Sequence, residues 1–152
     1  MGWNTQMIYV KYKKLTDTAK EPTRGSMRAA GYDLYADTGN DIMMFPGEVV
    51  EFFTGIAMEI PDGYFGAIYP RSGLATKMGL RLANCVGVID SDYRGNIGVP
   101  LHNDSRRPVV VKAHERIAQI VIQACPDIVL KEAQDLSETA RGENGFGSTG
   151  RT

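Results

Sequence analysis

Short apolar runs separated by turn residues constrain the fold of this chain most strongly. The turn signals are Pro46-Gly47, Pro61-Asp62-Gly63, Arg94-Gly95 and Asn103-Asp104-Ser105, all sequences that favour tight reversals of the backbone. Runs rich in β-branched and aromatic residues between such turns are typical of strands. The predicted strands cover residues 7–11, 42–45, 49–54, 56–60, 66–69, 85–89, 97–101, 108–112, 116–124 and 128–131. We therefore expect an all-β, jelly-roll-like antiparallel barrel or sandwich.

One helix and one irregular terminus complete this organisation. A single short helix is expected over residues 73–78, with Gly73 at its start and Gly79 just after its end. The β domain is expected to span residues 1–136, because residues 137–152 show no apolar periodicity. Residues 141–150 are rich in glycine and contain one Phe, so this arm is either a solvated tail or a lid that orders on a ligand. Backbone N–H groups and an Arg in such a segment are suited to phosphate oxygens.

The composition limits the kinds of molecule that this chain is expected to bind. The 152 residues suit one domain, and the net charge of −1 gives no general attraction to nucleic acid or to an anionic membrane. No apolar run approaches the ~20 residues of a membrane span, and no targeting signal is evident, which predicts an intracellular, cytoplasmic protein. Cys85 and Cys125 lack metal-ligand or redox spacing, so we expect two buried, reduced thiols.

Residues 87–99 carry the strongest candidate for chemistry. Two apolar strands flank a polar tip, which predicts a β-hairpin. Asp90 lies where the first strand gives way to the turn and is a candidate general base. Tyr93 follows and can form a wall for a flat ligand. A surface turn with solvated acids is the alternative interpretation of this segment alone.

A second group of polar residues suits phosphate. Arg71, Ser72 and Gly73 follow a predicted strand and open the predicted helix, where free N–H groups, a guanidinium and a hydroxyl meet. Asp33 on a predicted strand can hold a metal-bound water, orient an Arg, or stand as an ordinary edge-strand acid. Gln119 lies inside an otherwise apolar strand and needs either a core carbonyl or a ligand as its partner.

Five segments occur in one order along the chain: residues 30–34, 70–74, 87–95, 115–119 and 141–150. Together they resemble the homotrimeric dUTPase family over residues 22–150. The resemblance implies a jelly-roll-like subunit, a three-fold trimer with active sites shared between subunits, and Mg²⁺-assisted hydrolysis of dUTP to dUMP and pyrophosphate. That reaction keeps uracil out of DNA and supplies dUMP for thymidylate synthesis. One position departs from the family pattern, because residues 112–114 contain no turn glycine before Glu115.

The resemblance also implies roles for single residues. Asp90 would activate the attacking water, and Tyr93 would pack on the deoxyribose and exclude a 2′-hydroxyl. Asp33 would reach the metal through water. The uracil edge would be bound by Asn84, Gly87, Val88, Ile89 and Gly98. The phosphates would be contacted by Arg71, Ser72, Gly73 and Gln119. The lid would be formed by Arg141, Phe146, Gly147 and Ser148, with Phe146 over the uracil.

Two other functions fit the same fold. A dCTP deaminase resembles dUTPases and uses a Glu near the end of the second hairpin strand; the aligned position here is about Pro100, and no Glu lies between Arg94 and Asp104. A non-catalytic nucleotide-binding regulatory trimer is the second alternative. The presence of Asp90 and of the glycine-rich arm favours the dUTPase over it.

Overall fold

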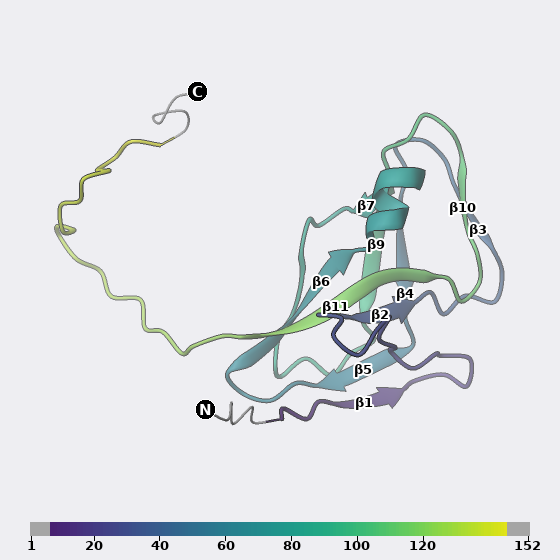
Figure 1. Ribbon diagram of the computed structural model, residues 1–152, viewed down its shortest axis with the longest axis horizontal. Coiled ribbons are helices and arrows are strands. Elements are labelled where there is room, and N and C mark those ends of the chain that lie inside the picture. The colour runs from purple at the N-terminus through teal and green to yellow at the C-terminus, as the bar shows by residue number, and fades with distance from the viewer. Residues whose placement is uncertain (1–6, 146–152) are drawn as a thin grey trace.

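The computed structural model describes residues 7–145, and their regular structure is almost entirely β, as predicted (Figure 1). The strands are β1 (Lys11–Lys14), β2 (Tyr32–Tyr35), β3 (Ile42–Met44), β4 (Val49–Phe53), β5 (Ile56–Glu59), β6 (Tyr64–Pro70), β7 (Leu80–Leu82), β8 (Gly87–Ile89), β9 (Gly98–Asn103), β10 (Val109–Val111) and β11 (Arg116–Ala124). One helical turn, η1 (Leu74–Met78), lies between β6 and β7. Gly79 ends this turn with φ 72°, and its N–H donates to the Leu74 carbonyl, which is the usual use of glycine after a helix.

All strand pairs are antiparallel. One sheet has the order β2-β11-β6-β8 and another the order β4-β9-β7, while β1 pairs with β5 and β10 with β3. The long strand β11 runs beside both β2 and β6 (Figure 1). No helix in the described part of the chain is long and apolar enough to cross a membrane.

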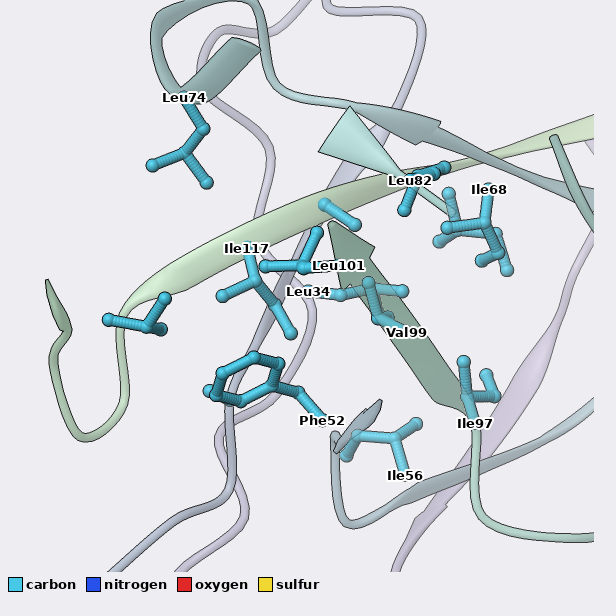
Figure 2. Close-up of a cluster of buried hydrophobic side chains, with 14 of the residues drawn as sticks. Leu34, Phe52, Ile56, Ile68, Leu74, Leu82, Ile97, Val99, Leu101 and Ile117 are labelled. Carbon is cyan, nitrogen blue, oxygen red and sulfur yellow. The ribbon is translucent and has the colours of Figure 1, made fainter. Parts of the chain in front are cut away.

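The core lies between these sheets. Side chains alternate between interior and surface along β9, and the inward set includes Val99 and Leu101. Phe52, Ile56 and Ile117 face the same interior (Figure 2). Each is at most 2% exposed, so each contributes roughly 1.5–3 kcal/mol of transfer free energy. This core fixes the two sheets whose ends carry the candidate site residues.

The predicted hairpin over residues 87–99 is wrong in one respect, because its two strands do not pair with each other. β8 pairs with β6, whereas β9 pairs with β4 and β7. Ile97 causes the separation, since its N–H donates to the Ile56 carbonyl at 2.9 Å and its carbonyl accepts the Thr54 N–H at 3.0 Å. The loop between the strands therefore carries the chain from one sheet to the other.

Other predictions differ locally. β1 begins where the predicted strand 7–11 ends, and residues 128–131 form no strand and lie exposed. β7 was not predicted from the sequence. Cys85 and Cys125 are exposed, so their predicted burial is wrong. Cys85 has φ 64° in the tight connection between β7 and β8, which turns this residue out of the sheet.

Candidate functional site

A cleft of about 280 Å³ lies between β8 and the start of β9. The structure brings together here seven residues predicted from the sequence: Asn84, Gly87, Val88, Ile89, Asp90, Tyr93 and Gly98. Four lining residues were missed by the sequence analysis: Glu51, Phe53, Asn96 and Pro100. Glu51 and Phe53 alternate with the buried Phe52 on β4, and no local pattern in the sequence predicts that this strand lies beside residues 87–99.

Unpaired backbone faces this cleft. β8 is the last strand of its sheet and pairs only with β6 among the described strands, so its other edge is free. On the far side of the cleft, Gly98 pairs with Phe53 of β4, while β7 reaches only as far as Leu101. A free strand edge presents N–H donors and carbonyl acceptors in a row. The opened hairpin thus provides a slot in which backbone groups are available to the edge of a flat ring.

The loop over residues 90–97 holds Tyr93 at the mouth of the cleft. The Tyr93 N–H donates to the Asp90 carbonyl at 3.2 Å, and the Tyr93 hydroxyl donates to the Asn96 carbonyl at 3.0 Å. The ring lies directly over Gly95, where a Cβ atom would be only 2.6 Å from the ring carbon Cζ. Asn96 fastens the loop to the next turn by accepting the Gly55 N–H at 2.9 Å. These contacts fix the Tyr93 ring and leave the Asp90 side chain exposed beside it.

A second cluster gathers around Asp33. One carboxylate oxygen accepts from Arg71 Nε at 3.0 Å, and the other accepts from Arg116 Nη1 at 3.2 Å. Arg71 also donates to the Arg116 carbonyl at 3.3 Å. The Asp33 side chain is only 13% exposed. The two guanidinium groups compensate the charge of this largely buried carboxylate. Of the interpretations of Asp33, the one that orients an Arg is confirmed.

Gln119 lies beside this cluster, opposite Asp33 in the β2–β11 register. Its amide Nε2 donates to the Pro70 carbonyl at 3.1 Å, so it has a backbone partner. Its Oε1 packs close to Gly31, where a Cβ atom would lie 2.9 Å away. Small residues before β2 thus make room for the Gln119 side chain.

Ser72 and Gly73 are exposed at the start of η1. The Ser72 hydroxyl does not cap the helical turn, because Gly73 occupies the cap position and no side chain bonds there. The Ser72 carbonyl accepts from Thr76 Oγ1 at 2.7 Å. The Ser72 side chain therefore remains exposed next to Arg71 in the chain.

The two clusters lie at opposite ends of β6. Asp90 follows Ile89, which pairs with Gly66. Arg71 follows Pro70 at the other end of the same strand. Gly66 and Arg71 are separated by about 17 Å of extended chain at a rise of ~3.3 Å per residue, which is longer than a triphosphate. The backbone positions of Asp90 and Arg71 in one chain therefore lie well apart along β6.

The C-terminal arm extends away from the strands (Figure 1). Arg141 is exposed and donates from Nε to the Asn144 carbonyl at 3.0 Å. Phe146, Gly147 and Ser148 lie outside the described residues. Over residues 7–145 no group of three His, Cys, Asp or Glu side chains is placed to hold a metal ion.

Comparisons with known proteins show which family this chain resembles. A model of the dUTPase family matches residues 17–150. A deoxyuridine 5′-triphosphate nucleotidohydrolase from Nautilia profundicola is 46% identical over 93% of this chain and 99% of its own length. The protein of that name from Mus musculus is 43% identical over 93% of this chain and 85% of its own length.

A solved structure shows the same fold. The G164S mutant of the dUTPase of Staphylococcus bacteriophage 80alpha, with dUpNHpp, superposes with a TM-score of 0.83. It is 29% identical and covers 93% of this chain and 98% of its own length. With the family pattern matched over residues 17–150 and close relatives along nearly the whole chain, this protein belongs to the dUTPase family.

Proposed function

We propose that this chain hydrolyses dUTP to dUMP and pyrophosphate in the cleft between β8 and β9. The observation that carries the proposal is the opened hairpin, which sets the Asp90 carboxylate beside a slot of free backbone in a chain of the dUTPase family. The fold alone supports several functions, whereas this arrangement of carboxylate and free backbone favours one of them.

The slot explains a preference for uracil. Backbone donors and acceptors of Gly87, Val88, Ile89 and Gly98, with the Asn84 amide, pair with the edge of the base. Cytosine exchanges a carbonyl for an amine and a donor for an acceptor, which leaves buried groups unpaired. A site that binds a base through such hydrogen bonds can discriminate by ~10⁴-fold or more.

Asp90 acts as the general base. Its carboxylate takes a proton from a water molecule as the water attacks, and the α–β phosphoanhydride bond breaks to release dUMP and pyrophosphate. A positioned base of this kind contributes ~10²–10⁴-fold to the rate. Tyr93, fixed over Gly95, packs on the deoxyribose and excludes a 2′-hydroxyl.

Arg71, Ser72, Gly73 and Gln119 bind the phosphate groups. Positioning and charge neutralisation supply most of the catalysis in phosphoryl transfer. Asp33 would hold Mg²⁺ through water, and the ion would supply neutralisation of charge on the phosphates. Each Asp33 oxygen keeps a lone pair beyond its arginine bond, so the two roles are compatible.

The active site is shared in a trimer. Support comes from the separation of Asp90 and Arg71 along β6, because a site that uses both must take them from different chains. The arm beyond β11 exposes Ile128, Val129, Leu130 and Leu136, each at least 75% exposed. Such an apolar segment needs a partner surface, and we assign it to a neighbouring subunit, with residues 137–152 closing over the substrate.

The test is pyrophosphate release from dUTP, dCTP, dTTP and UTP, each with Mg²⁺ and with chelator. We expect release from dUTP alone and loss of most of it with chelator. Ammonia release from dCTP supports the deaminase instead, and tight dUTP binding without turnover supports the regulatory trimer. The Asp90→Asn variant is expected to lose at least ~10²-fold in kcat while it still binds dUpNHpp; strong residual hydrolysis would contradict the assigned base.

A further inference from the structure

Asn96 lines the cleft but lies outside the set of residues that bind dUTP in the proposed function. The side chain is partly buried, and its Oδ1 atom accepts the Gly55 N–H at 2.9 Å. The Asn96 backbone carbonyl accepts from the Tyr93 hydroxyl at 3.0 Å. Asn96 therefore connects the aromatic ring at the mouth of the cleft with the turn between β4 and β5.

The turn that holds Asn96 is buried and tightly packed. Gly55 has φ 67°, a conformation that favours glycine, and a Cβ atom there would lie 2.6 Å from the Ala19 Cβ atom. The Gly55 carbonyl accepts the Leu15 N–H at 2.7 Å. A buried backbone N–H without an acceptor is unfavourable, so the bond from Gly55 to Asn96 Oδ1 resists breaking. This turn is therefore a fixed point for the loop over residues 90–97.

The side chain of Asn96 makes this attachment depend on the sequence. The other bonds between the loop and the turn use the backbone of Ile97, and any residue except proline can make them at that position. Among the described residues, Asn96 has the one side chain in the loop that bonds to residues 54–56. Loss of its acceptor therefore frees the loop without changing the backbone ladder.

Gly95 transmits the attachment to the cleft. It directly precedes Asn96 and supports the Tyr93 ring, whose Cε2 atom would lie 2.9 Å from a Cβ atom at Gly95. A shift of Asn96 therefore moves the support and the ring together. A displacement of about 1 Å in a positioned group can change a rate about 10²-fold, so the ring needs a firm support if it is to exclude a single oxygen atom.

We propose that Asn96 is a positioning residue for the selection of deoxyribose over ribose. It acts through Tyr93, because its bond to Gly55 fixes the loop, and the loop fixes Gly95 beneath the ring that excludes a 2′-hydroxyl. The inference deepens the proposed function and rests on it.

The experiment measures kcat/KM for UTP and for dUTP with the full-length chain, because their ratio cancels effects common to both nucleotides. Asn96→Ala removes the acceptor, and we expect it to raise the UTP:dUTP ratio by about threefold or more. Asn96→Asp keeps an acceptor oxygen for the Gly55 N–H, so its ratio is expected to stay near that of the unmodified chain. Asn40→Ala is the matched control, since Asn40 is exposed between β2 and β3 and has no side-chain hydrogen bond among the described residues. We expect the control to leave the ratio unchanged.

A double variant tests whether Asn96 acts through Tyr93. In Tyr93→Ala the ring is absent, so the addition of Asn96→Ala is expected to change the ratio by less than about twofold. A full further increase there, an unchanged ratio in Asn96→Ala alone, or a ratio as high in Asn96→Asp as in Asn96→Ala would overturn the inference. Should Asn96→Ala fail to fold, Asn96→Ser decides, because its oxygen lies one bond closer to the backbone than Oδ1, and an unchanged ratio in it contradicts the inference. Turnover of dUTP by the unmodified chain, measured first, tests the proposed function separately.

Discussion

At the scale of single residues, the turn before β11 shows how the chain accommodates a missing glycine. His114 adopts φ 57° between Lys112 and Glu115. The turn closes by a hydrogen bond from the Glu115 N–H to the Lys112 carbonyl at 3.0 Å, and Glu115 Oε2 accepts the Lys112 N–H at 2.8 Å. The His114 N–H donates to the Ala36 carbonyl at 3.1 Å. Tertiary hydrogen bonds thus hold a side-chain-bearing residue in a conformation that favours glycine.

Replacing His114 tests this strain. His114→Gly is expected to raise the free energy of unfolding by ~0.5–1 kcal/mol, because the left-handed conformation costs ~1–2 kcal/mol for an L-residue and the added freedom of the unfolded chain offsets part of the gain. Thermal unfolding measures the change. His114→Ala keeps the Cβ atom and serves as control; an equal gain in both variants would show that the histidine ring, rather than the backbone, carries the strain.

Tyr93 carries a second prediction at this scale. Tyr93→Ala is expected to raise activity on UTP relative to dUTP, since removal of the ring over Gly95 makes room for a 2′-hydroxyl. The ratio of kcat/KM for the two nucleotides is the measurement. Tyr93→Phe keeps the ring and loses only the bond to the Asn96 carbonyl, so its ratio should stay near that of the unmodified chain. An unchanged ratio in Tyr93→Ala counts against the sugar-wall role.

At the scale of elements, the sequence predicted β11 to the residue and most other strands to within a few, because turn residues punctuate strongly periodic runs. The sequence also placed most of the cleft residues in one segment, but the predicted hairpin wrongly paired β8 with β9. Pairing depends on Ile97 bonding to Ile56 and Thr54, a long-range choice that no local pattern encodes. For the same reason Glu51 and Phe53 were missed, since their place beside the cleft follows from the register of β4 with β9.

The arm after β11 gives the prediction at this scale. Removal of residues 141–152 is expected to leave a folded protein, because over residues 7–145 the last strand ends at Ala124 and no residue after it belongs to the core cluster. Turnover is expected to fall severely, since the lid no longer closes over the substrate and positions its phosphates for attack. Circular dichroism and steady-state kinetics are the measurements. Unfolding of the truncated chain, or an unchanged rate, would contradict the lid.

At the scale of the whole molecule, the length of β6 separates two clusters of candidate site residues. Asp90 and Tyr93 belong to one end, and Arg71, Arg116 and Asp33 belong to the other. The sequence motifs gave no sign of this separation, because they interleave along the chain. Only the order β2-β11-β6-β8 reveals it. The family resemblance implied shared sites, and the strand order supplies a physical reason for them.

Mixed subunits test the sharing. Asp90→Asn and Arg71→Gln each remove one cluster and are expected to be inactive alone. Unfolded and refolded together in equal amounts, they are expected to regain activity at about a quarter of the sites if subunits assort at random. Pyrophosphate release from dUTP before and after mixing is the measurement, with each variant refolded alone as control. No recovery in a mixture shown to contain hybrid trimers would place both clusters in one chain's site.

The gap between β8 and β9 has a consequence for how the protein senses its ligand. A further strand could complete a ladder there, and in the proposed function the uracil ring occupies that place and bonds to backbone on both sides of the gap. The bound nucleotide would then bridge the two sheets, and its release would open the gap again. Under the proposed function, each turnover therefore adds and then removes a hydrogen-bonded link between the two sheets at this gap.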